Sequence, residues 1–300
     1  MQKRLKVLAI QGGGALGIIP IHFLSMLPTD CQNLEKVDVL SGTSIGGILA
    51  CALATGKQFS ELDMVFQQKA KQCFTKRFNA RINPLAVPVY RNDKLDEVLR
   101  EMIGDNVLGD VKKVYPKLNL IVPALDVTKD EYLVFSNLSH KYDDVPLFDI
   151  AGMTSAAPSF FDCREFRGSA VVDGGLLDLD SCVTAVTEIK KYLNIPFCSL
   201  DVLLLGCGND IDPDPLTVKK YRNLSLLGIA TDVLRAYATL GNQLANQKFL
   251  EGMGFNYFCY WNPLTTSGKL DDVSQIPSLV KEADKHREEF LRVWNYWISL

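Results

Sequence analysis

Residues 37–54 constrain the fold of this chain more than any other stretch. They read VDVLSGTSIGGILACALA, which is an apolar run, a turn of small residues, and a second run with the spacing of a buried helix. A strand, sharp turn and helix would place Ser44 at the tip of the turn, because Gly42 and Gly46 let strand and helix approach without a Cβ clash. The hydroxyl would then lie at a helix N-terminus, where the helix dipole favours an alkoxide or oxyanion. A helix-capping serine in a glycine-rich turn is the alternative interpretation of so short a motif.

The composition is that of an ordinary globular chain. Of 300 residues, 47% are hydrophobic and 22% charged, enough apolar material for a large core. The net charge of -3 gives no reason to expect nucleic-acid binding. The eight cysteines show no C-x-x-C spacing and no histidine-rich neighbour, so we expect buried, reduced thiols. No cluster of residues has the spacing of metal ligands, and we expect neither a metal nor a cofactor.

The N-terminus is basic and then apolar, but it leads into a glycine loop, which favours a first strand over a signal peptide. No apolar run reaches the length of a membrane-spanning helix. We therefore expect a cytoplasmic protein, and delivery into another cell without a cleavable signal stays open.

Apolar runs and helical patterns alternate along the whole chain. The expected strands are residues 5–10, 37–40, 118–124, 132–136, 170–172, 202–205 and 257–261. The expected helices are residues 18–27, 45–54, 59–77, 91–102, 150–157, 181–192, 224–249 and 276–300. This alternation is typical of a mostly parallel sheet covered on both faces, a three-layer α/β/α sandwich. No linker or change of composition divides the chain, so we predict a single domain over residues 1–300.

The turn after the first strand holds a second glycine motif, QGGGALG. Gly12, Gly14 and Gly17 match the G-x-G-x-x-G pattern of a dinucleotide site, which also follows a strand and opens a helix. Such a site needs an acid at the end of the second strand, whereas Asp38 lies at its beginning. Successive glycines have another use, because their unhindered N–H groups can point at one oxygen and form an oxyanion hole.

A nucleophilic serine needs a base, and the chain has three histidines. His22 lies in the first predicted helix, His140 in a polar loop, and His286 in KEADKHREEF, which is typical of a solvated helix face. Asp173 is the better candidate, since an apolar strand precedes it and two glycines follow it. An Asp-Gly-Gly segment can be just a turn. Beside an elbow serine, a partly buried aspartate with raised proton affinity can act directly as the base.

The motifs QGGGALG, GTSIGG and VVDGG, in this order, resemble those of the patatin-like phospholipases, acyl hydrolases with a Ser–Asp dyad. The resemblance extends to TSAAPSFF, LGCG and LDD, so it covers nearly the whole chain. It implies that Ser44 is the nucleophile and Asp173 its base. It also implies an oxyanion hole formed by the N–H groups of Gly12, Gly13 and Gly14, so Gly14→Ala is expected to stop turnover with little loss of stability. The remaining motif glycines are Gly17, Gly42, Gly46, Gly174 and Gly175.

Two positions depart from the family pattern. Leu16 stands where many plant-type members have an arginine, so a charged contact near the oxyanion loop is absent. Residues 179–181 (Leu-Asp-Ser) stand where the family has two asparagines and a proline. The second departure leaves open how the Asp173 loop is held.

The resemblance implies a calcium-independent serine ester hydrolase that cleaves phospholipid or lysophospholipid esters through an acyl-enzyme and contacts membrane surfaces transiently. Residues 59–102 would lie over the site, and the apolar run at 84–90 would pack in the core or hold a lipid tail. Trp294, Tyr296 and Trp297 would dock a last helix on the core or rest at a membrane interface. Two alternatives stay open: an idle binding or regulatory protein of the same fold, and a dinucleotide-binding protein.

Overall fold

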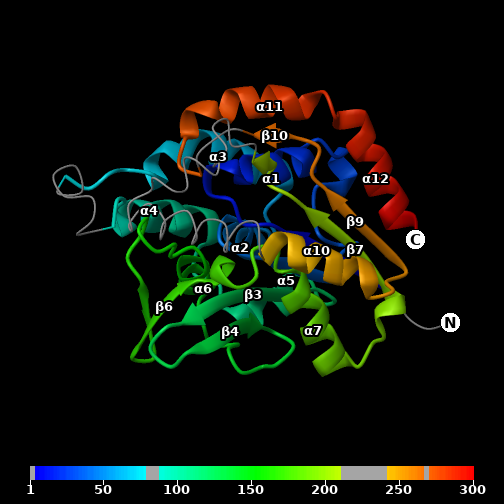
Figure 1. Cartoon of the computed structure of the whole chain (residues 1–300), viewed down its shortest axis with the longest axis horizontal. Helices are drawn as coiled ribbons and strands as arrows, with labels where there is room; N and C mark the ends of the chain where they lie inside the picture. Colours follow the sequence, from blue (N-terminus) through cyan, green and yellow to red (C-terminus); the bar gives the residue numbers. More distant parts are fainter. Residues whose placement is uncertain (1–3, 79–87, 211–241, 267–269) are drawn as a thin grey trace, which may run out of the picture.

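The computed structural model describes residues 4–78, 88–210, 242–266 and 270–300. Its centre is an eight-stranded sheet in the order β5-β6-β3-β2-β1-β7-β9, with β4 also paired to β3 (Figure 1). The strands are β1 (Leu5–Ile10), β2 (Val39–Gly42), β3 (Asn119–Asp126), β4 (Glu131–Ser136), β5 (Arg164–Phe166), β6 (Ser169–Asp173), β7 (Leu200–Leu205) and β9 (Tyr257–Trp261). A separate short parallel pair consists of β8 (Asn209–Asp210) and β10 (Thr265–Thr266).

The middle of the sheet is parallel. β1 lies between β2 and β7 and is parallel to both, and β9 is parallel to β7. These strands have near-continuous apolar sequences because helices cover both of their faces. The register pairs Ile10 with Gly42. The glycine loop after β1 and the turn after β2 therefore begin side by side, at the carboxyl ends of these two strands.

The other edge of the sheet is antiparallel, which the prediction of a mostly parallel sheet did not include. β3 pairs antiparallel with β4 and β6, and β6 pairs antiparallel with β5. The turn between β3 and β4 is too short for the crossover that a parallel pair requires. The antiparallel register sets Asp173 at the end of β6 opposite Ala124 of β3.

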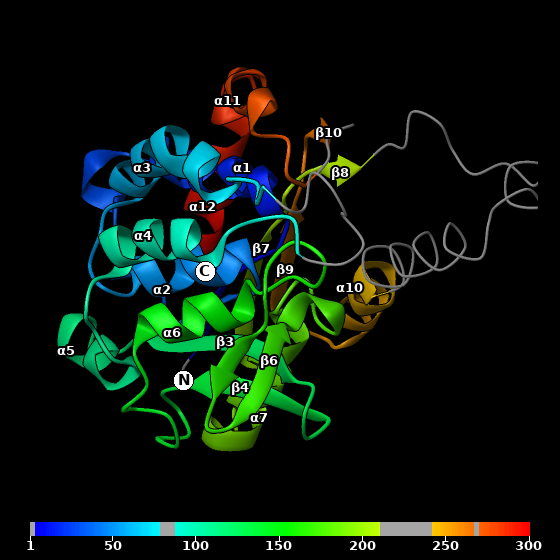
Figure 2. The same ribbon diagram turned by 90° about the vertical axis from the view of Figure 1, so that its left-hand side faces the viewer.

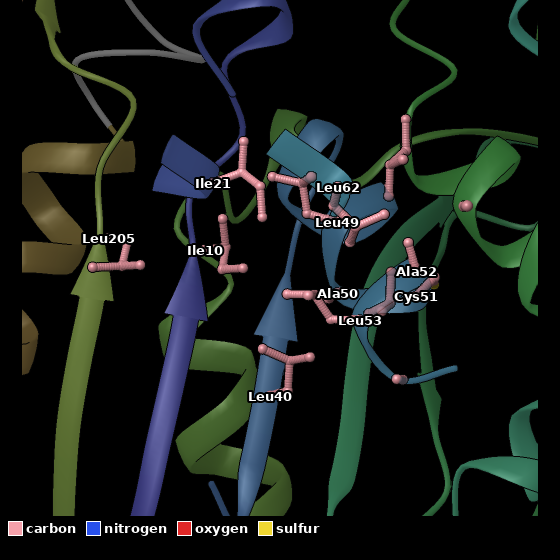
Figure 3. Close-up of a cluster of buried hydrophobic side chains, with 14 of the residues drawn as sticks. Ile10, Ile21, Leu40, Leu49, Ala50, Cys51, Ala52, Leu53, Leu62 and Leu205 are labelled. Atoms are coloured by element: carbon pink, nitrogen blue, oxygen red, sulfur yellow. The ribbon is translucent and has the colours of Figure 1, made fainter. Parts of the chain in front are cut away.

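Most helices cover one face of the sheet (Figure 2). They are α1 (Ile18–Ser25), α2 (Ile45–Leu53), α3 (Phe59–Cys73), α4 (Asn92–Ile103), α6 (Leu147–Thr154), α11 (Ile276–Asp284) and α12 (Arg287–Ser299). Figure 3 shows Ile10, Leu40 and Leu205 of neighbouring strands in one cluster with Leu49 and Leu53 of α2. α5 (Val111–Val114) is a single turn before β3.

The opposite face is covered by α7 (Cys182–Leu193) and α10 (Asn242–Gly252). Alternate strand residues point this way, among them Val7, Val39 and Val202, and they form a second core cluster with Ile189 of α7 and Leu250 of α10. Two helical layers around one sheet confirm the predicted three-layer α/β/α fold.

Several predicted boundaries need correction. The last helix is two helices, because the chain bends at His286 (φ -96°, ψ 6°) before α12 begins. The bend lets Trp294 and Trp297 dock on the core, where the Trp297 indole N–H donates to the Asp201 carbonyl at 2.8 Å. The helix predicted for 59–77 ends at Cys73. The helix predicted for 224–249 lies outside the described residues up to 241, and so does most of the apolar run at 84–90.

None of the described helices is both long enough and apolar enough to cross a bilayer.

Candidate active site

Ser44 lies at the turn between β2 and α2, as the glycine pattern predicted. Its backbone has φ 55° and ψ -125°, a strained conformation for a residue with a side chain. The Ser44 N–H donates to the Thr154 hydroxyl at 3.1 Å, and this hydroxyl donates to the Pro123 carbonyl at 2.7 Å. The strained turn is thus held by a side chain of α6 that the sequence analysis did not single out.

The glycines of the elbow have no room for a side chain. A Cβ at Gly42 would lie 2.1 Å from the Gly46 carbonyl oxygen, and a Cβ at Gly46 would lie 2.1 Å from the Ile10 carbonyl oxygen. At Gly17 a Cβ would lie 2.3 Å from the side chain of Ile45. Because glycine has no Cβ, the strand, turn and helix can pack this closely around Ser44.

Asp173 ends β6 and is 5% exposed. Its carboxylate Oδ1 accepts from the Gly175 N–H at 2.8 Å, and its side chain is hydrogen-bonded to that of Ser44. Burial raises the pKa of Asp173 to about 6, and the hydrogen bonds from Ser44 and Gly175 limit the rise. A Cβ at Gly174 would lie 2.6 Å from the Pro123 carbonyl oxygen, so the Asp-Gly-Gly turn also depends on glycine.

Ser44 and Asp173 both line a cavity of about 250 Å³. Apolar side chains of α2, α3 and α4 form one part of its wall: Ile45, Ile48, Phe66, Ala70, Leu95, Val98, Leu99 and Met102. α3 and α4 thus lie over the site, as predicted for residues 59–102. The cavity joins a hydroxyl–carboxylate pair to an apolar chamber, which suits a substrate with an acyl chain beside an ester.

The loop of Gly12, Gly13 and Gly14 lines the same cavity. The Gly12 N–H, which was predicted to be one of three oxyanion donors, instead donates to the Leu179 carbonyl at 2.9 Å. The N–H groups of Gly13 and Gly14 donate to no acceptor among the described residues, so they remain available to a substrate oxygen.

Gly14 has φ +57°, and a Cβ there would lie 2.3 Å from the Leu270 carbonyl oxygen. At Gly13 a Cβ would lie 2.6 Å from that of Cys207. The expectation that Gly14→Ala leaves stability nearly unchanged is therefore wrong. The new methyl group would clash with the Leu270 backbone, and alanine would have to adopt a left-handed backbone conformation.

None of the three histidines lines the cavity with Ser44. His22 contacts Asp63 at 3.0 Å and Asp284 at 3.2 Å, and His140 contacts Asp143 at 2.8 Å. His286 lies 3.6 Å from Glu289 in an ion pair. Each imidazole is thus engaged elsewhere, which leaves Asp173 beside the serine.

The position of Asp38 does not fit the interpretation of the glycine loop as a dinucleotide site. The Asp38 carboxylate accepts from the Lys6 N–H at 2.9 Å, near the start of β1 and β2 and at the opposite end of these strands from the glycine loop. Among the described residues, no group of three or more His, Cys, Asp or Glu side chains is placed to hold a metal ion.

A family model described as patatin-like phospholipase matches residues 8–179, which include Ser44, Asp173 and all the motif glycines. The chain belongs to the patatin-like phospholipase family. Membership in this family supports a lipid-hydrolysing function, and the apolar cavity beside Ser44 agrees with a lipid substrate.

Named relatives agree with this assignment. A "cGAMP-activated phospholipase" of Escherichia coli (strain TW11681) is 31% identical over 245 residues, 73% of this chain and 67% of the relative. "Patatin-like protein 2" of Oryza sativa subsp. indica is 26% identical over 70% of this chain and 62% of its own length. A "cGAMP-activated phospholipase" of Vibrio cholerae is 25% identical over 91% of this chain and 82% of its own length. The match thus spans about two thirds of the first two relatives.

The two departures from the patatin-like pattern have different surroundings. Leu16 is 4% exposed and belongs to the large core cluster, so an apolar contact replaces a charged one. Residues 178–181, here named the tether segment, accept hydrogen bonds from both the glycine loop and the Ser44 elbow through backbone carbonyls. Its Asp178 carbonyl accepts from the Thr43 hydroxyl at 2.8 Å, and its Leu179 carbonyl accepts from the Gly12 N–H. The tether segment therefore holds these loops without asparagine side chains.

A C-terminal contact near the glycine loop was also missed. The Ala15 N–H donates to the Leu270 carbonyl at 2.6 Å, and the next residue, Asp271, accepts a hydrogen bond from the Tyr90 hydroxyl. The sequence showed LDD as a family feature, but no local pattern reveals that its backbone supports a loop more than 250 positions away.

Proposed function

We propose that the protein is a lipid acyl hydrolase of the phospholipase A or lysophospholipase type, with Ser44 as nucleophile and Asp173 as base. The observation that carries this proposal is the buried hydrogen bond between these two side chains at the end of an apolar cavity. An apolar chamber beside a nucleophile fits the acyl chain of a lipid ester better than a polar substrate.

In the proposed reaction, the Ser44 oxygen bonds to the ester carbonyl carbon while its proton passes to Asp173. The carbonyl oxygen becomes negative and faces the N–H groups of Gly13 and Gly14, with the dipole of α2 adding to the stabilisation. The carbon–oxygen bond to the alcohol then breaks, and Asp173 gives its proton to the leaving oxygen. Water repeats these steps on the acyl-enzyme, which releases the fatty acid and restores Ser44.

The raised pKa of Asp173 suits this role. A base must be deprotonated before it can accept the serine proton, so turnover should rise as the pH increases through about 6. A carboxylate with a pKa near the working pH also takes up a proton more readily than an exposed aspartate does.

The test uses a diacyl phospholipid and the matching lysophospholipid, with products identified by mass spectrometry. Because relatives in E. coli and V. cholerae are named as cGAMP-activated, each assay is run with and without cGAMP. We expect fatty-acid release by the wild type, its loss in Ser44→Ala, and its retention in Ser60→Ala, which removes an exposed hydroxyl.

Hydrolysis by a folded Ser44→Ala variant would contradict the assignment of the nucleophile. A folded wild type that releases no fatty acid under any of these conditions would favour the alternative of a binding or regulatory protein.

A further inference from the structure

Asp180 is a buried carboxyl that the proposed reaction does not use. It lies in the tether segment with 0% of its surface exposed, and neither carboxyl oxygen makes a well-formed hydrogen bond among the described residues, although the Gln11 side chain lies close enough to interact with it. Buried polar groups almost always have hydrogen-bond partners, and a buried charge without one costs several kcal/mol. A neutral carboxylic acid is the form that this environment tolerates best.

The two acids of the tether segment, Asp178 and Asp180, differ in the hydrogen-bond donors that they contact. Asp178 accepts from the Thr184 N–H at 2.9 Å and from the Asn246 amide at 3.1 Å. These donors stabilise a charge on Asp178, and that charge in turn disfavours a second one on Asp180. Burial raises the pKa of Asp178 as well, but its hydrogen bonds oppose that rise, so we infer that Asp178 ionises before Asp180.

Within the part of the chain that the structure describes, the other groups that act on Asp180 carry no positive charge. They are the Cys182 thiol at the start of α7, the Cys207 thiol after β7, and the Gln11 side chain after β1. The Gln11 side-chain oxygen accepts from the Cys207 N–H at 3.0 Å and from the Tyr260 hydroxyl of β9 at 3.2 Å. Gln11 directly precedes the glycine loop in the sequence, so Asp180 lies beside the start of that loop.

The backbone around Asp180 holds both catalytic loops. On one side the Leu179 carbonyl accepts from the Gly12 N–H at 2.9 Å. On the other side the Ser181 carbonyl accepts from the Ser41 hydroxyl at 3.2 Å, and the Asp178 carbonyl accepts from the Thr43 hydroxyl at 2.8 Å. A shift of Asp180 would therefore move the partners of the glycine loop and of the elbow together.

We propose that Asp180, as a neutral carboxylic acid, is a positioning residue that keeps the tether segment in place against the glycine loop and the Ser44 elbow. Loss of its proton creates a buried, unpaired charge beside Gln11 and the two thiols. The segment then moves toward water, and its carbonyls release Gly12 and Thr43. Turnover is lost although Ser44 and Asp173 are unchanged.

The pH at which this occurs follows from the surroundings. Burial and then the charge of Asp178 raise the pKa of Asp180 to about 8, while the Gln11 side chain opposes the rise. Above that pH a single ionisation would lower turnover by about tenfold per pH unit. The proposal thus adds an alkaline limit to the acid limit that Asp173 sets near 6.

The same ionisation affects folding stability. The folded protein keeps a proton on Asp180 that the unfolded chain, with an ordinary aspartate, loses near pH 4. Because the folded state binds more protons over this range, stability falls as the pH rises from about 4 to about 8 and then levels off. Asp180→Asn cannot ionise, so its stability relative to the wild type should increase over the same range.

This inference rests on the proposed function for its kinetic readout, and the experiment adds readouts that do not. The pH profile of kcat is measured for the wild type, Asp180→Asn and Glu188→Gln, together with thermal unfolding and hydrogen exchange of peptides covering residues 10–17. Glu188 is a matched control, since it is a buried acid of α7 whose pKa is also raised by burial, and it touches neither catalytic loop.

We expect Asp180→Asn to shift the alkaline limb of kcat upward by at least about one pH unit, whereas Glu188→Gln leaves the limb in place. Exchange of residues 10–17, corrected for its intrinsic pH dependence, should increase above about pH 8 in the wild type but not in Asp180→Asn.

An alkaline limb and an exchange pattern that are the same in the wild type and Asp180→Asn would overturn the proposal. If Asp180→Asn does not fold, the wild-type exchange profile decides alone, and protection of residues 10–17 that persists above about pH 8 contradicts it. A wild type without hydrolysis would refute the proposed function, while exchange and unfolding would still test Asp180.

Discussion

Asp173 and Asp180 lie seven positions apart, and both carboxyls are buried near the glycine loop and the Ser44 elbow. Asp173 receives hydrogen bonds from Gly175 and Ser44, and its pKa rises to about 6 because burial outweighs them. Asp180 makes no well-formed hydrogen bond among the described residues, and burial with the charge of Asp178 raises its pKa to about 8 against the opposing effect of the Gln11 side chain.

The difference shows that burial alone does not decide what a carboxyl can do. Two donors keep Asp173 ionised near neutral pH, where it can take a proton from Ser44. In our proposal, Asp180 has no such pair of donors, keeps its proton over the same range and positions the tether segment. One loop thus carries a candidate base and a candidate support, and hydrogen-bond donors distinguish them.

The largest expected effect comes from removing the base. Asp173→Asn keeps the shape of the side chain but cannot accept the serine proton, so kcat should fall by about 10²–10⁴. Steady-state hydrolysis of a short-chain ester measures this, with folding checked by circular dichroism. If Asp180→Asn lost as much activity at neutral pH as Asp173→Asn, the distinction between the two carboxyls would fail.

An intermediate effect is expected from cutting one contact of the tether segment. Thr43→Val removes the hydroxyl that donates to the Asp178 carbonyl, which keeps only the longer hydrogen bond from the Ser181 N–H, so the unfolding free energy should fall by about 0.5–1.5 kcal/mol. Urea unfolding measures the loss. Thr187→Val is the control, because its hydroxyl lies on the exposed side of α7, and it should change stability by less than about 0.5 kcal/mol.

The smallest effect is expected at His22, a partly buried histidine whose partners are the two acids Asp63 and Asp284. Burial lowers the pKa of His22, but hydrogen bonds and charges of Asp63 and Asp284 more than offset this, so the pKa is raised. The stability from a raised histidine pKa is complete below the unfolded pKa of about 6.5 and is lost as the pH rises through the folded value.

His22→Gln should therefore destabilise the protein by about 1 kcal/mol at acidic pH and by less at alkaline pH, with turnover nearly unchanged. Thermal unfolding at two pH values measures the difference. A folded His22→Gln variant as inactive as Ser44→Ala would instead make a histidine the base.

The sequence was sufficient for features whose cause is local. The elbow at Ser44 was predictable because glycines at 42 and 46 are the residues that the close approach of β2 and α2 allows. The buried strands β1 and β7 and the three layers followed from apolar runs that alternate with helical patterns.

Features that depend on distant residues were not predictable. The antiparallel pairing of β6 with β3 depends on which edge of the sheet the chain returns to. The support of Ser44 by Thr154, of Ala15 by Leu270, and of Gly12 by Leu179 joins segments far apart in sequence. A single sequence carries no local signal for such contacts.

The most direct test of the Ser44–Asp173 assignment is the rate of covalent labelling by a fluorophosphonate, measured against pH and mapped by mass spectrometry. The assignment predicts one labelled residue, Ser44, and a labelling rate that rises with pH around a midpoint near 6 in the wild type. In Asp173→Asn this pH dependence should disappear and labelling should be slow at every pH. Labelling at another residue, or an unchanged pH dependence in folded Asp173→Asn, would contradict the assignment.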